Sequence, residues 1–138
     1  MIRALPVLTA LVLTATAAWA EHEVFYRYTV IGYVRDAAGA PLRDQSLEVV
    51  RDKTGFSYLA RTDESGMFLF ITRLGDESDG ESLTLKYGPA SVQLTARFDP
   101  ANHTDERGTR VDVDAGRFVE RPAWFHSTLT QFLGSAQR

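Results

Sequence analysis

Short runs in which apolar and polar residues alternate recur along most of the chain, and clusters of Gly, Pro, Asp and Ser separate these runs. Strict alternation puts apolar side chains on one face of a β-strand, whereas an amphipathic helix repeats about every 3.6 residues. We expect strands at residues 24–34, 46–51, 56–62, 67–72, 82–87, 91–98 and 109–113. Seven short strands joined by turn signals at this spacing predict an all-β sandwich.

Two local features refine this prediction. The run at 67–72 is apolar on both faces, so we expect an interior strand that is covered on both sides. Residues 63–66 read Asp-Glu-Ser-Gly, a turn sequence, and we expect them to close a tight hairpin in which Gly66 has a positive φ.

The C-terminal segment has a helical period instead. Pro122 suits a first helical turn, and Gly134 is a plausible end, so we expect a short amphipathic helix within residues 122–138. A helix this short is marginal in water, so its apolar stripe must be covered by the sandwich, by a partner or by a second copy of the chain. We favour a partner, because two sheets already close a core. The candidate partner-binding residues are Trp124, Phe125, Leu129, Phe132 and Leu133.

The first twenty residues have the order of a secretory signal peptide. Arg3 is followed by an apolar, uncharged stretch over 5–18, and Ala18 and Ala20 supply the small residues that a signal peptidase requires. We expect cleavage after Ala20, with the sandwich domain at 21–121. A retained membrane anchor is the alternative, although the uncharged run at 4–20 is short for a span.

Composition narrows the class of protein. The chain has 15 Lys and Arg against 18 Asp and Glu, a formal net charge of −3, which argues against nucleic-acid binding. It has no cysteine, which excludes thiolate metal sites and a cysteine nucleophile. An exported chain without disulfides indicates a bacterial periplasm rather than an animal extracellular space.

Two motifs carry a resemblance to a known family. Residues 32–41 read Gly-Tyr-Val-Arg-Asp-Ala-Ala-Gly-Ala-Pro, which fits Gly-x-Val-x-Asp-x-x-Gly-x-Pro, and residues 62–68 fit Thr-Asp-x-x-Gly-x-Phe. Over roughly residues 26–97 the chain thus resembles the carboxypeptidase regulatory-like domains. The resemblance implies a transthyretin-like (prealbumin-like) sandwich and an accessory, stabilising or carbohydrate- and protein-binding role. It carries over no catalytic residue, because the shared positions form turns.

The chain lacks the sequence signatures of enzymes that have similar folds. Intradiol dioxygenases need two Tyr and two His around iron, with the His pair close in sequence, and no His-x-His occurs here. Hydroxyisourate hydrolases end in Tyr-Arg-Gly-Ser, whereas this chain ends in Gly-Ser-Ala-Gln-Arg. No Gly-x-Ser-x-Gly elbow is present either. We predict no catalytic residue and no cofactor, and a hydrolytic enzyme ranks third among the functions.

A periplasmic metal-binding protein is the alternative function. Histidine nitrogens and carboxylate oxygens suit copper or zinc. The side chains available for such a site are His22, His103, His126, Asp99, Asp105 and Glu106. The favoured interpretation leaves the three histidines unconnected and predicts no metal site.

Calcium is a second metal to weigh. The acidic loop contributes Asp76, Glu77, Asp79 and Glu81, but it lacks the ligand spacing of a known calcium loop. We interpret it as a solvated turn. The expected function is therefore an exported, non-catalytic binding or accessory module that acts with a protein or a cell-envelope component.

Overall fold

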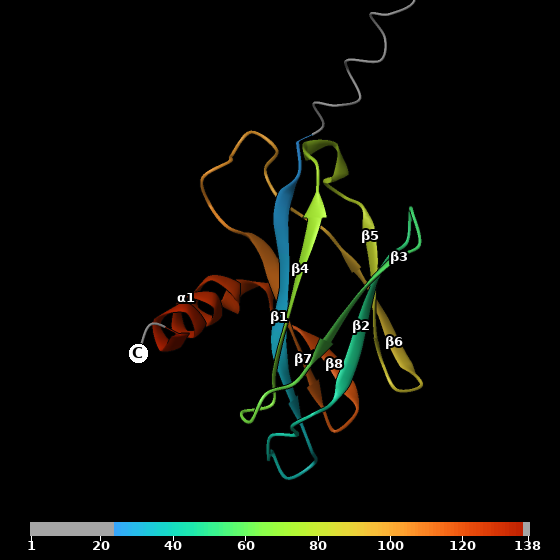
Figure 1. Ribbon diagram of the computed structural model, residues 1–138, viewed down its shortest axis with the longest axis vertical. Helices are drawn as coiled ribbons and strands as arrows, with labels where there is room; N and C mark the ends of the chain where they lie inside the picture. Colours follow the sequence, from blue (N-terminus) through green and yellow to red (C-terminus); the bar gives the residue numbers. More distant parts are fainter. Residues whose placement is uncertain (1–23, 137–138) are drawn as a thin grey trace, which may run out of the picture.

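The computed structural model describes residues 24–136, so the predicted signal peptide at 1–20 and His22 lie outside the described part. Two four-stranded sheets pack face to face, and a short helix lies against the outer side of one of them (Figure 1). The strands are β1 Tyr26–Arg35, β2 Ser46–Arg51, β3 Phe56–Arg61, β4 Met67–Leu74, β5 Ser82–Tyr87, β6 Ala90–Thr95, β7 Arg107–Asp114 and β8 Arg117–Glu120. The helical elements are η2 Asp76–Ser78, η3 Pro122–Trp124 and α1 Phe125–Ala136.

The strand orders are β4-β1-β7-β8 in one sheet and β3-β2-β5-β6 in the other. All neighbouring strands are antiparallel except β1 and β7, which run parallel. The all-β prediction, the two sheets and the C-terminal helix are confirmed. No helix in residues 24–136 has the length and apolar character needed to cross a membrane.

The predicted number of strands was wrong, because residues 24–136 form eight strands rather than seven. β8 was missed because it has only four residues, and its two charged ends enclose a single apolar pair, Phe118 and Val119. It forms because the turn after Asp114 folds the chain back onto β7. Several strand ends also differ from the predicted ones: β7, for example, begins at Arg107 rather than at Thr109.

The prediction that residues 67–72 form an interior strand was also wrong. β4 is an edge strand, paired only with β1, and its Ile71 is exposed. Residues 63–66 do not close a hairpin, because β3 and β4 belong to different sheets and the turn carries the chain from one sheet to the other. The second apolar face of β4 is covered near its start by α1 rather than by a sheet.

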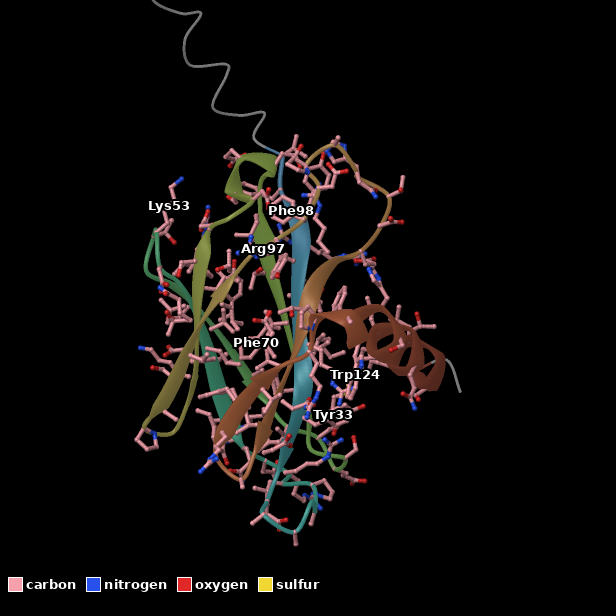
Figure 2. All side chains as sticks on the ribbon, turned by 180° about the vertical axis from the view of Figure 1, so that it is seen from behind. Tyr33, Lys53, Phe70, Arg97, Phe98 and Trp124 are labelled. Carbon is pink, nitrogen blue, oxygen red and sulfur yellow. The ribbon has the colours of Figure 1, made fainter. Side chains whose placement is uncertain are left out.

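The main core lies between the sheets. It contains alternate residues of β1, β2, β4, β5 and β7, and its largest fully buried side chains include Tyr28, Phe68 and Phe70. Phe70 lies between the two sheets in Figure 2. Burial of this apolar surface is the main favourable term in folding.

A glycine permits a close approach of β1 and β7. A Cβ atom on Gly32 would lie 1.6 Å from the carbonyl oxygen of Val111 on β7. The ladder between β1 and β7 is interrupted at Gly32 and Tyr33, and the Tyr33 amide instead donates to the side chain of Asp112 at 3.1 Å. The first glycine of the Gly-x-Val motif is therefore required by sheet geometry rather than by a turn.

The helix α1 packs on its own domain. Phe125 is buried and its ring lies against Gly108, and Leu129 is 9% exposed; both join Ile31 and Met67 in a second core cluster. Phe132 packs against the same cluster, whereas Trp124 and Leu133 remain about half exposed. The sandwich thus covers the inner part of the stripe that we expected a partner to bind.

The predicted helix end at Gly134 was wrong, since α1 continues to Ala136. A glycine ends a helix when it adopts a positive φ, and Gly134 is not among the glycines that do so.

Gly66 should be intolerant of substitution. Its φ is +78°, as expected, and an added Cβ atom would lie 2.7 Å from the carbonyl oxygen of Val34. We expect Gly66→Ala to lower the free energy of unfolding by about 2–3 kcal/mol, because backbone strain and a steric clash add together. Gly88→Ala is the matched control, since Gly88 also has a positive φ but has open space around it. Equal losses in urea unfolding of the two variants would show that the clash is unimportant.

The helix should contribute to stability through its inner face. We expect Leu129→Ala to cost about 2–4 kcal/mol, because it removes a buried side chain from the second core. Leu133→Ala, at a position 48% exposed on the same helix, should cost well under about 1 kcal/mol. Chemical denaturation measures both, and equal small effects would mean that α1 does not hold to the sheet.

Candidate binding groove

An apolar groove opens at the corner where the edge strands of the two sheets, β3 and β4, meet. Its volume is about 630 Å³. Three aromatic side chains and two arginines dominate its wall, which is mostly apolar. The lining residues are Phe25, Arg51, Thr54, Gly55, Phe56, Tyr58 and Arg73.

The turn between β2 and β3 sets the aromatic wall. The Gly55 amide donates to the Arg51 carbonyl at 2.7 Å, and the Thr54 hydroxyl accepts from the Phe56 amide at 3.2 Å. Phe56 and Tyr58 are two residues apart on β3 and therefore face the same side. Their rings pack edge to face with centroids 4.9 Å apart. Phe56 is 59% exposed, whereas Tyr58 is half-buried and packs partly against the main core.

Only one of the two groove arginines has an internal partner. Arg51 makes a bidentate ion pair with Glu81, with 3.0 Å between Nη2 and Oε2, and also donates to the Ser78 hydroxyl. The hydrogen bonds from Arg51 hold the pKa of Glu81 below its usual range. Arg73 is exposed and, within residues 24–136, has no carboxylate within ion-pair distance. The groove therefore offers one uncompensated cation beside aromatic rings.

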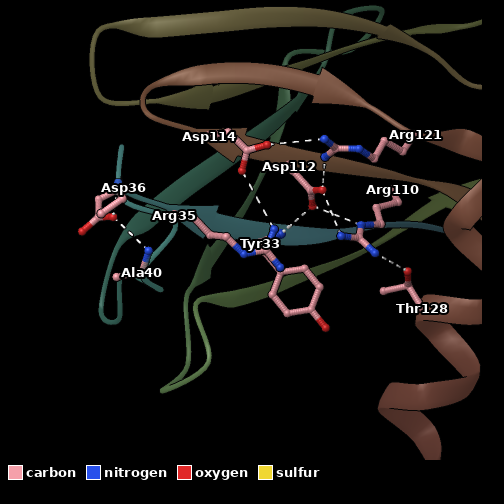
Figure 3. Close-up of polar contacts among 10 residues, drawn as sticks. Tyr33, Arg35, Asp36, Ala40, Arg110, Asp112, Asp114, Arg121 and Thr128 are labelled. Carbon is pink, nitrogen blue, oxygen red and sulfur yellow. Dashed lines mark hydrogen bonds and ion pairs between the residues drawn. The ribbon is translucent and has the colours of Figure 1, made fainter.

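A polar cluster around Asp112 joins β1, β7 and α1 (Figure 3). The Asp112 side chain is completely buried and accepts hydrogen bonds from the Tyr33 amide, from Arg110 and from Arg121. Arg110 also donates to the Thr128 hydroxyl at 3.0 Å, which joins β7 to α1. These contacts fix the start of the helix on the sheet.

Trp124 lies beside this cluster rather than in a pocket. The centroid of its ring lies 5.2 Å from the guanidinium carbon of Arg110 and 5.1 Å from that of Arg121. Arg110 in turn lies 5.0 Å from the ring of Tyr33. Figure 2 shows Trp124 and Tyr33 near α1 and Lys53 on the far side of the sandwich. Trp124 is the most exposed of the five candidate tail residues.

The two histidines in the described part of the chain, His103 and His126, make different contacts. His103 stacks on Tyr26 with centroids 4.5 Å apart, and its Nε2 lies 2.8 Å from Asp76. His126 lies on α1 and lines a small hollow with Asp99, Asp105 and Glu106, among others. Nowhere in the described part of the chain do three His, Asp or Glu side chains converge in a way that suits a metal ion.

The acidic loop residues have other partners. Asp76 accepts from Arg107 at 3.0 Å as well as contacting His103, and Asp79 accepts from the Phe98 amide at 3.0 Å. Glu81 pairs with Arg51. The carboxylates therefore do not converge on a calcium ion among the described residues.

Sequence reasoning missed the groove. The alternation at 56–62 predicted that Phe56 and Tyr58 share a face, but it did not show that β3 lies at an edge or that β4 brings Arg73 beside it. The available signal was local: an aromatic pair directly after the turn at 52–55, with arginines on either side in the sequence.

No protein-family model and no curated protein matches the chain. The chain is similar to a solved structure, the dioxygenase domain of a dioxygenase and carbohydrate-binding protein fusion from the cellulolytic bacterium Streptomyces sp. SirexAA-E. The identity is 21% and the TM-score is 0.44, over 67% of this chain and 80% of that one. A likeness at this level carries no argument about activity.

The Arg51–Glu81 pair should make stability depend on pH. Both side chains are nearly buried, so Arg51→Gln leaves the Glu81 carboxylate without its cation. We expect the free energy of unfolding at pH 7 to fall by about 2–4 kcal/mol. Because the pKa of Glu81 is lower in the folded chain, the pair stabilises above the unfolded-state pKa, and this contribution disappears as the pH falls through the folded-state pKa.

The difference between wild type and Arg51→Gln should therefore shrink as the pH is lowered into the acid range, as measured by urea unfolding at each pH. Arg117→Gln is the control, since Arg117 is exposed on β8 in the other sheet and should change little. A loss that stays constant with pH would contradict the role assigned to the ion pair.

Proposed function

We propose that the chain is an exported, non-catalytic binding module of the bacterial periplasm, and that its partner is a protein which docks in the groove between β3 and β4. The observation that carries this proposal is the exposure of aromatic side chains beside an uncompensated arginine. Phe56 is 59% exposed, and Phe25 and Tyr58 share the groove with it. Exposed apolar surface of this kind is costly in water and is typical of interaction sites.

We also propose that the sandwich is a transthyretin-like domain of the carboxypeptidase regulatory-like family. The motif residues form the turns that the resemblance implies. Asp36 Oδ1 accepts from the amides of Ala38 and Ala40, both at 2.9 Å, and Asp63 Oδ1 accepts from the amides of Ser65 and Met67, also at 2.9 Å. Both aspartates hold backbone amides in turns, which supports the proposal that the shared motif residues form turns.

A retention experiment distinguishes the groove from the surface around Trp124 as the site that binds the partner. A cell-envelope extract is passed over the immobilised chain, over Phe56→Asp and over Trp124→Asp. Both positions are at least half exposed, so both variants should fold. We expect the wild type and Trp124→Asp to retain the same proteins and Phe56→Asp to lose them, because a carboxylate in the apolar groove opposes docking. Retention by Phe56→Asp, or no retained protein at all, would overturn the proposal.

A further inference from the structure

The edge of β3 carries backbone groups that have no partner strand. The Thr62 amide donates to the Gln45 carbonyl on the β2 side at 3.0 Å. Hydrogen-bonded pairs alternate along an antiparallel ladder, so the amides of Ser57, Leu59 and Arg61 point away from β2. Within residues 24–136 no backbone group is bonded to these three amides.

The neighbouring edge of β4 follows the same geometry. The Val34 amide donates to the Gly66 carbonyl at 2.8 Å, so the amides of Leu69, Ile71 and Arg73 point away from β1. The Arg73 amide reaches the Tyr58 hydroxyl at 3.2 Å, which confirms this direction. β4 therefore stands beside β3 without pairing with it.

β3 is less protected than the edge at β8. Exposed edges are normally shortened or charged, and β8 has four residues, of which Arg117 and Glu120 are charged. By contrast, β3 exposes Leu59 at 79% in the middle of the strand, in addition to Phe56. A six-residue edge with an exposed leucine is a template for another strand.

The groove lies where the side chains of an added strand would point. Phe56 and Tyr58 face the groove from β3, and side chains on an added strand alternate between the two faces in register with those of β3. Side chains of the added strand that lie beside Phe56 and Tyr58, on the same face, would enter the groove. Main-chain hydrogen bonds and one side-chain pocket together make the usual recognition mode of strand addition.

Charge selects the kind of strand. Lys53, Arg61 and Arg73 surround this edge, and none of them has a carboxylate within 4.0 Å among the described residues. These three cations form a basic rim, and two of the acidic side chains beside it are engaged in hydrogen bonds: Asp52 accepts from Ser82 and Thr84, and Asp63 accepts from the amides of Ser65 and Met67. Complementary charge favours an acidic partner. A second copy of the chain fits poorly, because pairing two β3 edges would bring two basic rims together.

We propose that an extended, acidic segment of the partner protein adds to β3 as a fifth strand of the sheet β3-β2-β5-β6 and places an apolar side chain in the groove. This inference rests on the proposed function, since it names how the groove is used.

Two peptides and two proline variants test the proposal. The probes are a short blocked peptide of alternating aspartate and valine with a central phenylalanine, and its counterpart with lysine for aspartate. Leu59→Pro removes an outward amide, which an edge strand tolerates. Gln93→Pro is the matched control, because Gln93 is the corresponding exposed position on β6 at the other edge of the same sheet. Fluorescence anisotropy gives the affinities.

We expect the aspartate peptide to bind the wild type and Gln93→Pro about tenfold or more tightly than the lysine peptide does. Leu59→Pro should lose this binding, and Arg61→Glu should weaken the preference for the aspartate peptide without changing the strand backbone. In the wild type, hydrogen exchange at Ser57, Leu59 and Arg61 should slow when the aspartate peptide is present. This amide measurement keeps the test valid if Leu59→Pro does not fold.

Unchanged binding in folded Leu59→Pro, equal binding of the two peptides, binding of neither, or dimerisation of the chain through β3 would overturn strand addition. The retention experiment with Phe56→Asp is independent of these peptides. If that experiment succeeds and the peptide experiment fails, the groove binds a partner by another mode and the proposed function stands.

Discussion

The buried carboxylate of Asp112 is the contact on which the rest of the architecture depends. It takes the place of a ladder hydrogen bond at the amide of Tyr33, where the glycine at 32 lets β7 come too close for regular pairing. A buried charge is tolerated only when it is paired and hydrogen-bonded, and two arginines supply this. One of them, Arg110, continues to Thr128 on α1, so the parallel strand pair and the helix are fixed by the same group.

Seating the helix on one sheet makes the two outer faces of the sandwich different. α1 covers part of the outer face of β1 and β4 and buries Phe125 and Leu129 there. Among residues 24–136 no helix covers the β3-β2-β5-β6 sheet, and no strand pairs with the free edge of β3 beside β4 (Figure 1). The groove is therefore a consequence of topology: residues 63–66 move the chain between sheets instead of joining β3 to β4 as a hairpin.

Alternation and turn chemistry predicted the local elements well, because both act within a few residues. β2 and β5 have the expected bounds, and Gly66 has the expected positive φ. Contacts between residues far apart in the sequence could not be predicted from these local patterns. The sequence around β4 shows two apolar faces but not that a helix some fifty residues later covers one of them. The groove joins Phe25, Phe56 and Arg73, which only the completed fold brings together.

An open edge is a liability that most sandwiches avoid, since it invites pairing between copies. Here the edge combines apolar side chains, which promote association, with Arg61 and Arg73, which oppose association with an identical chain. Long-range repulsion disfavours the homotypic pair, and in the strand addition that we propose the same charges attract the acidic segment and accelerate its encounter. In this proposal one arrangement of residues opposes self-pairing and selects the partner. This accounts for a surface that is apolar and basic at one corner of an otherwise acidic chain.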